Sequence, residues 1–287
     1  MRKDIEPNDG RRAFAETDIE FRRRLNGPRR HDAGVAGFRL QAHQHESVRA
    51  QRQRLGAVGD GWKVSLTTLM NERMSIGAGV ATGFPFGPYH YTDALGPKLG
   101  YVPLLIGPAY LGVGYLSWVI ATVLVGDVKR GDNDLAVFAT PLIGAFVMVL
   151  WDLTLDPAVS TLGGWWMWEK GGGFFGVPLS NYLGWYLTVY AFMQAFAIYL
   201  VARGPEATTA QPKSYYMQAV SMYAVVALQF VVNWAVKGST TLVDANGVNW
   251  RSGDLLETSA ITAIFTMGFV AVLTAITVAR APGEKAP

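Results

Sequence analysis

The distribution of charged and apolar positions divides the chain into blocks. Five blocks are long and carry no charge: Val102–Val125, Leu135–Trp151, Leu179–Ala202, Ser214–Val236 and Thr258–Ala279. A bilayer core about 30 Å thick needs roughly 20 residues of helix. Four runs reach that length, and the run from Leu135 reaches it if its helix continues to Asp156. The pattern predicts an all-α, polytopic membrane bundle with helices near 102–125, 135–156, 179–202, 214–236 and 256–279. A soluble protein of this length could hardly cover five such helices.

The positive charge is concentrated at the N-terminus. Residues 1–75 hold 15 of the 25 Lys and Arg residues and 10 of the 22 Asp and Glu residues. This region also has few apolar groups, and their burial cannot offset the entropy of ordering the backbone. We therefore expect residues 1–78 to be largely disordered and residues 79–287 to form the transmembrane domain. The arginine clusters at 22–24 and 29–30 indicate a solvated tail, with anionic lipid as a second option. Nucleic-acid binding is disfavoured, because the aromatic residues that would accompany it are absent.

Composition limits the chemistry that the chain can perform. It contains no Cys and only 4 His. The missing cysteines exclude disulfides, thiolate nucleophiles, Fe–S clusters and Cys-type zinc sites, and so few histidines disfavour a His-rich metal site. The side of the membrane with more Lys and Arg in its loops is expected to be the cytoplasmic one. Here that side changes when the basic N-terminal region is included in the count, so the sequence does not predict the orientation.

The stretch between the second and third runs carries two acids and many aromatic residues. Asp152 and Asp156 are four residues apart, which places them on one face of a helix that Pro157 is expected to terminate. Membrane carboxylates are costly unless they pair, reach water or do chemistry. The alternative is that both lie in the headgroup region and that the neighbouring tryptophans form an interfacial belt.

Other polar and aromatic positions fall into two groups. The segment Gly83–Thr92 (GFPFGPYHYT) is aromatic, rich in Gly and Pro and nearly uncharged, which favours a rigid non-helical segment against protein or the interface. Its His90 is either part of a site or an ordinary hydrogen-bonding partner. In the later spans the polar residues are expected to face the bundle and not the lipid. They are Gln194, Gln218, Gln229 and Asn233.

Three motifs resemble one family of membrane proteins. They are GFPFGPYHYTDALGPKLGYVPL from Gly83, WDLTLDP from Trp151 and GGGFFGVPLSNYLGWYL from Gly171. In this order they resemble the carotenoid biosynthesis family of bisanhydrobacterioruberin hydratases and γ-carotene or lycopene 1,2-hydratases, over about residues 80–280. The resemblance implies a multi-pass enzyme of the cell membrane, a hydro-lyase that adds water to the terminal double bond of an acyclic carotenoid. It implies no organic cofactor and no redox metal, and other carotenoid-pathway membrane enzymes as possible partners.

The segment ahead of these motifs differs from the family pattern. Full members have further hydrophobic helices there, whereas residues 55–78 of this chain resemble the junction of the middle and helical domains of acyl-CoA dehydrogenases. A helix from about Trp62 to Ser75 is expected, without the catalytic Glu or flavin contacts of those enzymes. A fused or recombined reading frame would explain the join. Two alternatives to an active hydratase follow: a non-catalytic carotenoid-binding membrane protein, and an acyl-CoA dehydrogenase-derived fusion without flavin activity.

The residues support acid-catalysed hydration. Protonating a trisubstituted alkene gives a tertiary carbocation that water captures, and two carboxyls on one helical face can divide the roles of acid and base. Asp152 or Asp156 is the expected proton donor, with Glu169 as the next candidate. The expected aromatic slot and cation-stabilising faces are Trp151, Trp165, Trp166, Phe174 and Phe175. Ser180 and Asn181 are expected to position water, with Tyr89 and His90 on the opposing wall. Ring closure by a cyclase, which also begins with protonation, stays open.

Overall fold

The computed structural model describes residues 76–204 and 211–283. Every described residue belongs to one unit of the chain, Val64–Pro287. The expected disorder of the basic region, and all but the end of the segment resembling acyl-CoA dehydrogenases, lie outside the described residues.

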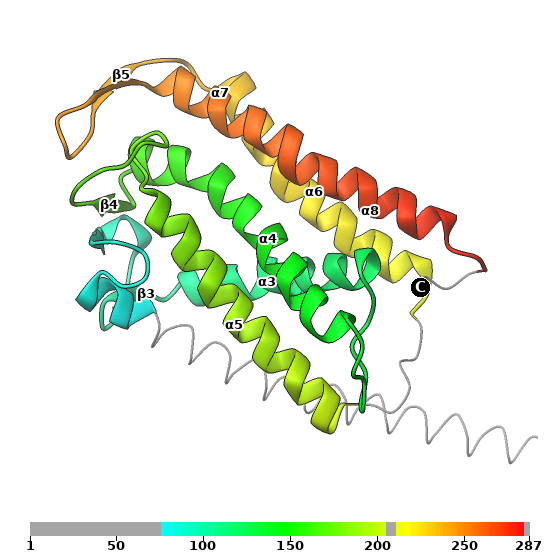
Figure 1. The fold of residues 1–287 in the computed structure, drawn as a ribbon. Coiled ribbons are helices and arrows are strands. Elements are labelled where there is room, and N and C mark those ends of the chain that lie inside the picture. The colour runs from blue at the N-terminus through cyan, green and yellow to red at the C-terminus, as the bar shows by residue number, and fades with distance from the viewer. Residues whose placement is uncertain (1–75, 205–210, 284–287) are drawn as a thin grey trace, which may run out of the picture. The chain divides into compact units, whose positions relative to one another are not determined.

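Helices dominate the described part of the chain (Figure 1). Within it, five helices are long and apolar enough to cross a membrane. They are α3 (Ile106–Leu124), α4 (Ala136–Asp156) with its extension η2 (Pro157–Leu162), α5 (Leu179–Arg203), α6 (Lys213–Val236), and the continuous helix α7 (Ser252–Thr262), η3 (Ala263–Gly268) and α8 (Phe269–Arg280). The predicted fold class is confirmed, and the protein is an integral membrane protein.

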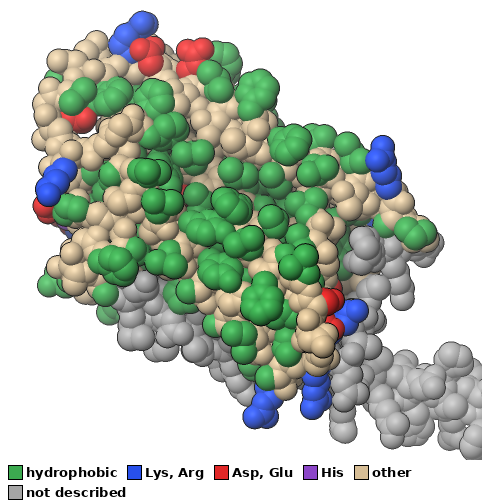
Figure 2. Space-filling view, viewed as in Figure 1, with side chains coloured by type: hydrophobic (Ala, Val, Ile, Leu, Met, Phe, Trp, Pro, Cys, Tyr) green, Lys and Arg blue, Asp and Glu red, His purple; other side chains and the backbone are tan. Residues whose placement is uncertain are grey.

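The surface agrees with this assignment. Figure 2 shows hydrophobic side chains spread over the middle of the helical face, with Lys, Arg, Asp and Glu at its margins. Helix α4 packs against α3 and α5, while α6 packs against α3 and the α7–η3–α8 helix. The Met193 side chain of α5 fills the space beside Gly144 of α4, where a Cβ would lie 2.6 Å from its sulfur. Such small-residue contacts are typical of helices that associate in membranes.

Three short antiparallel strand pairs lie outside the spans. β1 (Tyr89–Tyr91) pairs with β4 (Trp166–Trp168), β2 (Lys98–Leu99) with β3 (Val102–Pro103), and β5 (Thr241–Val243) with β6 (Asn249–Arg251). The β2–β3 pair explains why the first span begins at Ile106 and not at residue 102. The β1–β4 pair joins the segment before the first span to the segment after the second.

The second span does not end at Pro157, so the predicted termination there is wrong. The helix continues through a π-helical turn to Leu162. Proline removes one backbone donor and crowds the preceding turn, and π turns are common places where a helix accommodates such a disturbance. Gly163 N–H then donates to the Ala158 carbonyl at 3.0 Å and Gly164 N–H to the Ser160 carbonyl at 2.8 Å. Asp152 and Asp156 therefore lie inside a helix and not at its end.

The expectation for the polar residues of the later spans is correct for Gln194 and wrong for two others. Gln194 Nε2 donates to the Val137 carbonyl on α4 at 3.1 Å. Gln218 and Gln229 are exposed on α6. Helix α6 packs through the face that carries Tyr223 and Phe230, and both glutamines fall on the other face. Sequence spacing shows which residues share a face but not which face the neighbours cover.

Candidate functional site

The two acids of α4 are buried together where α3, α4 and α5 meet. Asp152 is 2% exposed and Asp156 is 1% exposed. Asn181 Nδ2, in the first turn of α5, donates to Asp156 Oδ2 at 2.5 Å and to Asp152 Oδ2 at 3.3 Å. Tyr110 Oη of α3 donates to Asp152 Oδ1 at 3.1 Å. Among the described residues, no cationic side chain forms an ion pair with either carboxyl.

Local chain geometry sets the position of Asn181. The loop before α5 turns tightly at Gly172, where a Cβ would lie 2.1 Å from the carbonyl carbon of Val177. Thr161 Oγ1 of η2 donates to the Phe175 carbonyl at 2.5 Å, which attaches this loop to the end of the acid-bearing helix. The amide of Asn181 is thereby held opposite the carboxyls of α4.

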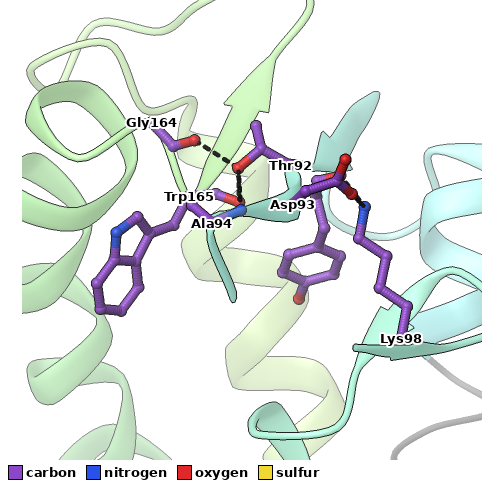
Figure 3. Close-up of polar contacts among 7 residues, drawn as sticks. Thr92, Asp93, Ala94, Lys98, Gly164 and Trp165 are labelled. Carbon is purple, nitrogen blue, oxygen red and sulfur yellow. Dashed lines mark hydrogen bonds and ion pairs between the residues drawn. The ribbon is translucent and has the colours of Figure 1, made fainter. Parts of the chain in front are cut away.

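A second set of contacts fixes β1 beside β4. Figure 3 shows the contacts of Thr92 with Gly164 and of Lys98 with Asp93. Thr92 Oγ1 donates to the Gly164 carbonyl at 2.8 Å, and Lys98 Nζ donates to Asp93 Oδ1 at 2.9 Å. Lys98 Nζ also donates to the Tyr91 carbonyl at 2.9 Å. These contacts hold the end of β1 against the turn that leads into β4.

A small cavity lies between these elements. The space for the centre of a water molecule within it is about 10 Å³, which is about what one water requires. Its lining is mostly aromatic: Tyr89, Tyr91, Ile106, Tyr110, Trp166, Trp168, Asn181 and Trp185. Tyr110 and Trp185 stack with ring centroids 4.2 Å apart. The carboxyls lie one side chain behind this wall, because Tyr110 and Asn181 both line the cavity and bind them.

The phenols of β1 are neutral groups in this setting. Burial raises the pKa of Tyr89 and of Tyr91, and the nearby carboxyls of Asp152 and Asp156 reinforce the shift. The Tyr182 hydroxyl also interacts with the Asp156 carboxyl, although its geometry falls short of a hydrogen bond. The acid pair is therefore surrounded by uncharged donors.

The structure brings part of the predicted set together. Tyr89 and Trp166 line the cavity, Asn181 joins it to the acids, and the Trp151 ring packs edge-on against Tyr110 at 5.3 Å. Ser180 is adjacent, but its hydroxyl donates to the Phe86 carbonyl at 2.9 Å.

The other predicted residues lie elsewhere. His90 and Glu169 are exposed, and Trp165 is 39% exposed. His90 points away because side chains alternate along β1, and its neighbours Tyr89 and Tyr91 take the inner face. Phe174 packs on Tyr182, and Phe175 on Trp250.

Sequence reasoning missed five lining residues: Tyr91, Ile106, Tyr110, Trp168 and Trp185. Three had a usable spacing signal. Tyr91 and Trp168 follow Tyr89 and Trp166 at the two-residue period of a strand. Trp185 follows Asn181 by four residues and so shares its helical face. For Tyr110 the only signal is a hydroxyl within an apolar run.

The chain is similar to one curated protein over part of its length. It is 34% identical over 111 residues to the bisanhydrobacterioruberin hydratase of Haloarcula japonica, a stretch that covers 38% of this chain and 36% of the relative. The chain thus matches little more than a third of that relative's length. No solved structure matches the chain.

A family model described as carotenoid biosynthesis protein matches residues 57–245. The match includes both acids, Asn181 and every residue of the cavity wall. It also covers most of residues 55–78, whose likeness to acyl-CoA dehydrogenases stays a prediction. Because this match spans more than half of the sequence, the chain belongs to the carotenoid biosynthesis protein family.

Proposed function

We propose that the protein adds water to the terminal double bond of an acyclic carotenoid end group. The observation that carries this proposal is the buried acid pair of Asp152 and Asp156, joined through Asn181 and Tyr110 to a cavity of one-water size. The similarity to a protein named as a hydratase supports the same reaction.

The acid pair supplies the proton. Two negative charges buried without a cationic partner are costly, which favours a pair that holds one proton. Asp152 accepts hydrogen bonds from both Tyr110 and Asn181, and such bonds favour an ionised carboxylate. Asp156 accepts a hydrogen bond from Asn181. Asp156 is therefore the proton donor, and Asp152 is the acceptor.

The aromatic wall stabilises the intermediate. Protonation at the CH carbon of the terminal alkene leaves a tertiary cation, and π faces attract cations most strongly where water is excluded. The stacked pair of Tyr110 and Trp185, with Trp166 and Trp168, provides such faces. A preformed wall needs no rearrangement as the charge develops.

Water then captures the cation and loses a proton. Tyr110 lines the cavity and donates to Asp152, so its hydroxyl offers a path from the water to that carboxylate. The C–O bond forms, one O–H bond of the water breaks, and Asp152 gains that proton, while the proton that Asp156 gave up stays in the new C–H bond of the product. Proton exchange between the two carboxyls completes the cycle. A polar path to a water-sized cavity supports capture by water over ring closure.

The test is carotenoid profiling after expression in a host that makes acyclic carotenoids. A hydratase gives a product heavier by one water, whereas a cyclase gives an isomer of unchanged mass. A protein that co-purifies with pigment but leaves it unchanged would be a binding protein. A flavin spectrum on the purified protein would indicate the fusion alternative.

A further inference from the structure

Two polar atoms in the cavity wall have no hydrogen-bond partner among the described residues. They are Tyr89 Oη and Trp168 Nε1. The Tyr91 hydroxyl also lies near Tyr89 Oη, but the geometry between the two falls short of a hydrogen bond. The side chains are 4% and 5% exposed, so bulk water does not satisfy them. Buried polar atoms in proteins are nearly always paired with protein or with ordered water. Two unpaired atoms on one small cavity therefore indicate a ligand.

The backbone places these two residues opposite each other. Tyr89 and Trp168 are direct partners in the β1–β4 register, and their rings lie with centroids 4.9 Å apart. The hydrogen bonds of Thr92 to Gly164 and Trp165 fix the same register from the end of the strand. The fold itself therefore fixes Tyr89 and Trp168 beside each other.

The size and chemistry of the cavity select the ligand. About 10 Å³ for the centre of a water molecule is enough for one water. The indole N–H is a donor only, while a neutral phenol both donates and accepts. A water accepts from the indole, exchanges a hydrogen bond with the phenol and so satisfies both groups.

We propose that Tyr89 Oη and Trp168 Nε1 hold one ordered water in this cavity, and that this water is the nucleophile of the hydration. The presence of the water does not depend on the proposed function, whereas its role as the nucleophile rests on it. The indole occupies one lone pair of the water oxygen and leaves the other for the cation. As the C–O bond forms, the proton leaves through Tyr110 to Asp152, in the same balance as above.

Isotope labelling separates water capture from protonation. In heavy water, a cation that is not captured loses a proton again and returns alkene that carries deuterium. We expect Tyr89→Phe and Trp168→Phe to lower alcohol formation about tenfold or more, because water is no longer held in position. Deuterium should still enter the recovered alkene. The matched controls are Tyr101→Phe and Trp234→Phe, at exposed positions away from the cavity; both should form alcohol at the wild-type rate.

Three outcomes would overturn the proposal. The first is alcohol formation at the wild-type rate in both cavity variants. The second is equal loss of alcohol and deuterium incorporation in well-folded variants, because the residues would then serve the acid step. The third concerns wild-type protein alone: a density map that resolves ordered water should place one between Tyr89 Oη and Trp168 Nε1, and a dry cavity rejects the site. Wild-type protein that forms neither alcohol nor deuterated alkene contradicts the proposed function, while the density map still decides the water site.

Discussion

The side-chain amide of Asn181 donates to the Asp156 carboxyl at 2.5 Å, and so links the first turn of α5 to the interior of α4. The same amide reaches Asp152. One neutral side chain thus bridges two acids that would otherwise repel each other.

Replacing this bridge should destabilise the bundle. Asn181→Ala leaves buried carboxyl oxygens without their donor, and we expect a loss of about 1–3 kcal/mol in the free energy of unfolding. Thermal unfolding of the detergent-solubilised protein measures the change. Gln229→Ala removes an exposed amide from α6 and should leave the transition where it is. Equal stability of Asn181→Ala and wild type would show that the bridge is not structural.

The two acids should respond differently to neutralisation. Asp156→Asn keeps the shape of the side chain but removes the proton donor, so the hydration rate should fall by about 10²–10⁴-fold. Asp152→Asn removes the charge that accepts the proton, and a smaller loss, at the lower end of that range (about 10²-fold), is expected. Product formation in membranes containing acyclic carotenoid gives both rates. Glu257→Gln, at an exposed carboxyl of α7, is the control. Wild-type rates in both Asn variants would remove the pair from the mechanism.

Tyr110 should affect turnover more than binding. Tyr110→Phe keeps the ring that stacks on Trp185 but removes the hydroxyl that leads to Asp152. We expect kcat to fall about 10–100-fold with KM nearly unchanged, because the lost hydroxyl acts in proton transfer. The control is Tyr115→Phe on the same helix, which removes a hydroxyl that is hydrogen-bonded to Tyr215. It should leave kcat and KM unchanged. A rise in KM at constant kcat would indicate that Tyr110 only binds substrate.

The β5–β6 hairpin should lose stability in acid. Burial alone would raise the pKa of Asp244, but hydrogen bonds donated by Trp250 Nε1 and by the backbone N–H groups of Val248 and Asn246 outweigh it, and the pKa lies below its usual value. The folded form therefore binds its proton more weakly than the unfolded form. The stabilisation is complete above the ordinary pKa of about 3.9 and disappears as pH falls through the lower, folded value.

The Trp250 indole N–H resonance reports this titration, because that proton is donated to the Asp244 carboxylate. Its shift should follow the pKa of Asp244 in wild type and should be insensitive to pH in Asp244→Asn. Asp254→Asn, at a carboxyl exposed on α7, should titrate like wild type. A titration midpoint of the wild-type resonance at or above pH about 3.9 would contradict the expected direction of the pKa shift.

The fold was largely predictable because the thickness of the bilayer sets the length of a membrane-spanning helix. Uncharged runs of that length can be recognised directly in the sequence. The errors have local causes. Val102 and Pro103 belong to a strand although they continue an apolar run, and a π turn carries the second span past Pro157. The exposed face of α6 depends on which neighbours pack against it, and one sequence does not contain that information.

The predictable residues of the candidate site are those that lie at short, regular intervals along the sequence. Asp152 and Asp156 follow from a four-residue interval on one helix. The motif before α5 identifies Asn181, and Trp185 follows it by the same four-residue interval, whereas Tyr110 joins the site through contacts between helices that leave no pattern in the chain. Side-chain chemistry alone favours His90 and Glu169, but both residues are exposed.

The pairing of β1 with β4 also constrains the order of events during synthesis. Trp168 leaves the ribosome about 80 residues after Tyr89, which at roughly 5–20 residues per second is a delay of several seconds. During that interval α3 and α4 emerge and must insert before the strands can meet. An aromatic segment that waits for its partner is prone to aggregate in water. Retention of the nascent Gly83–Tyr91 segment at the membrane surface would protect it, so the insertion machinery and the timing of translation bear directly on whether the cavity is ever assembled.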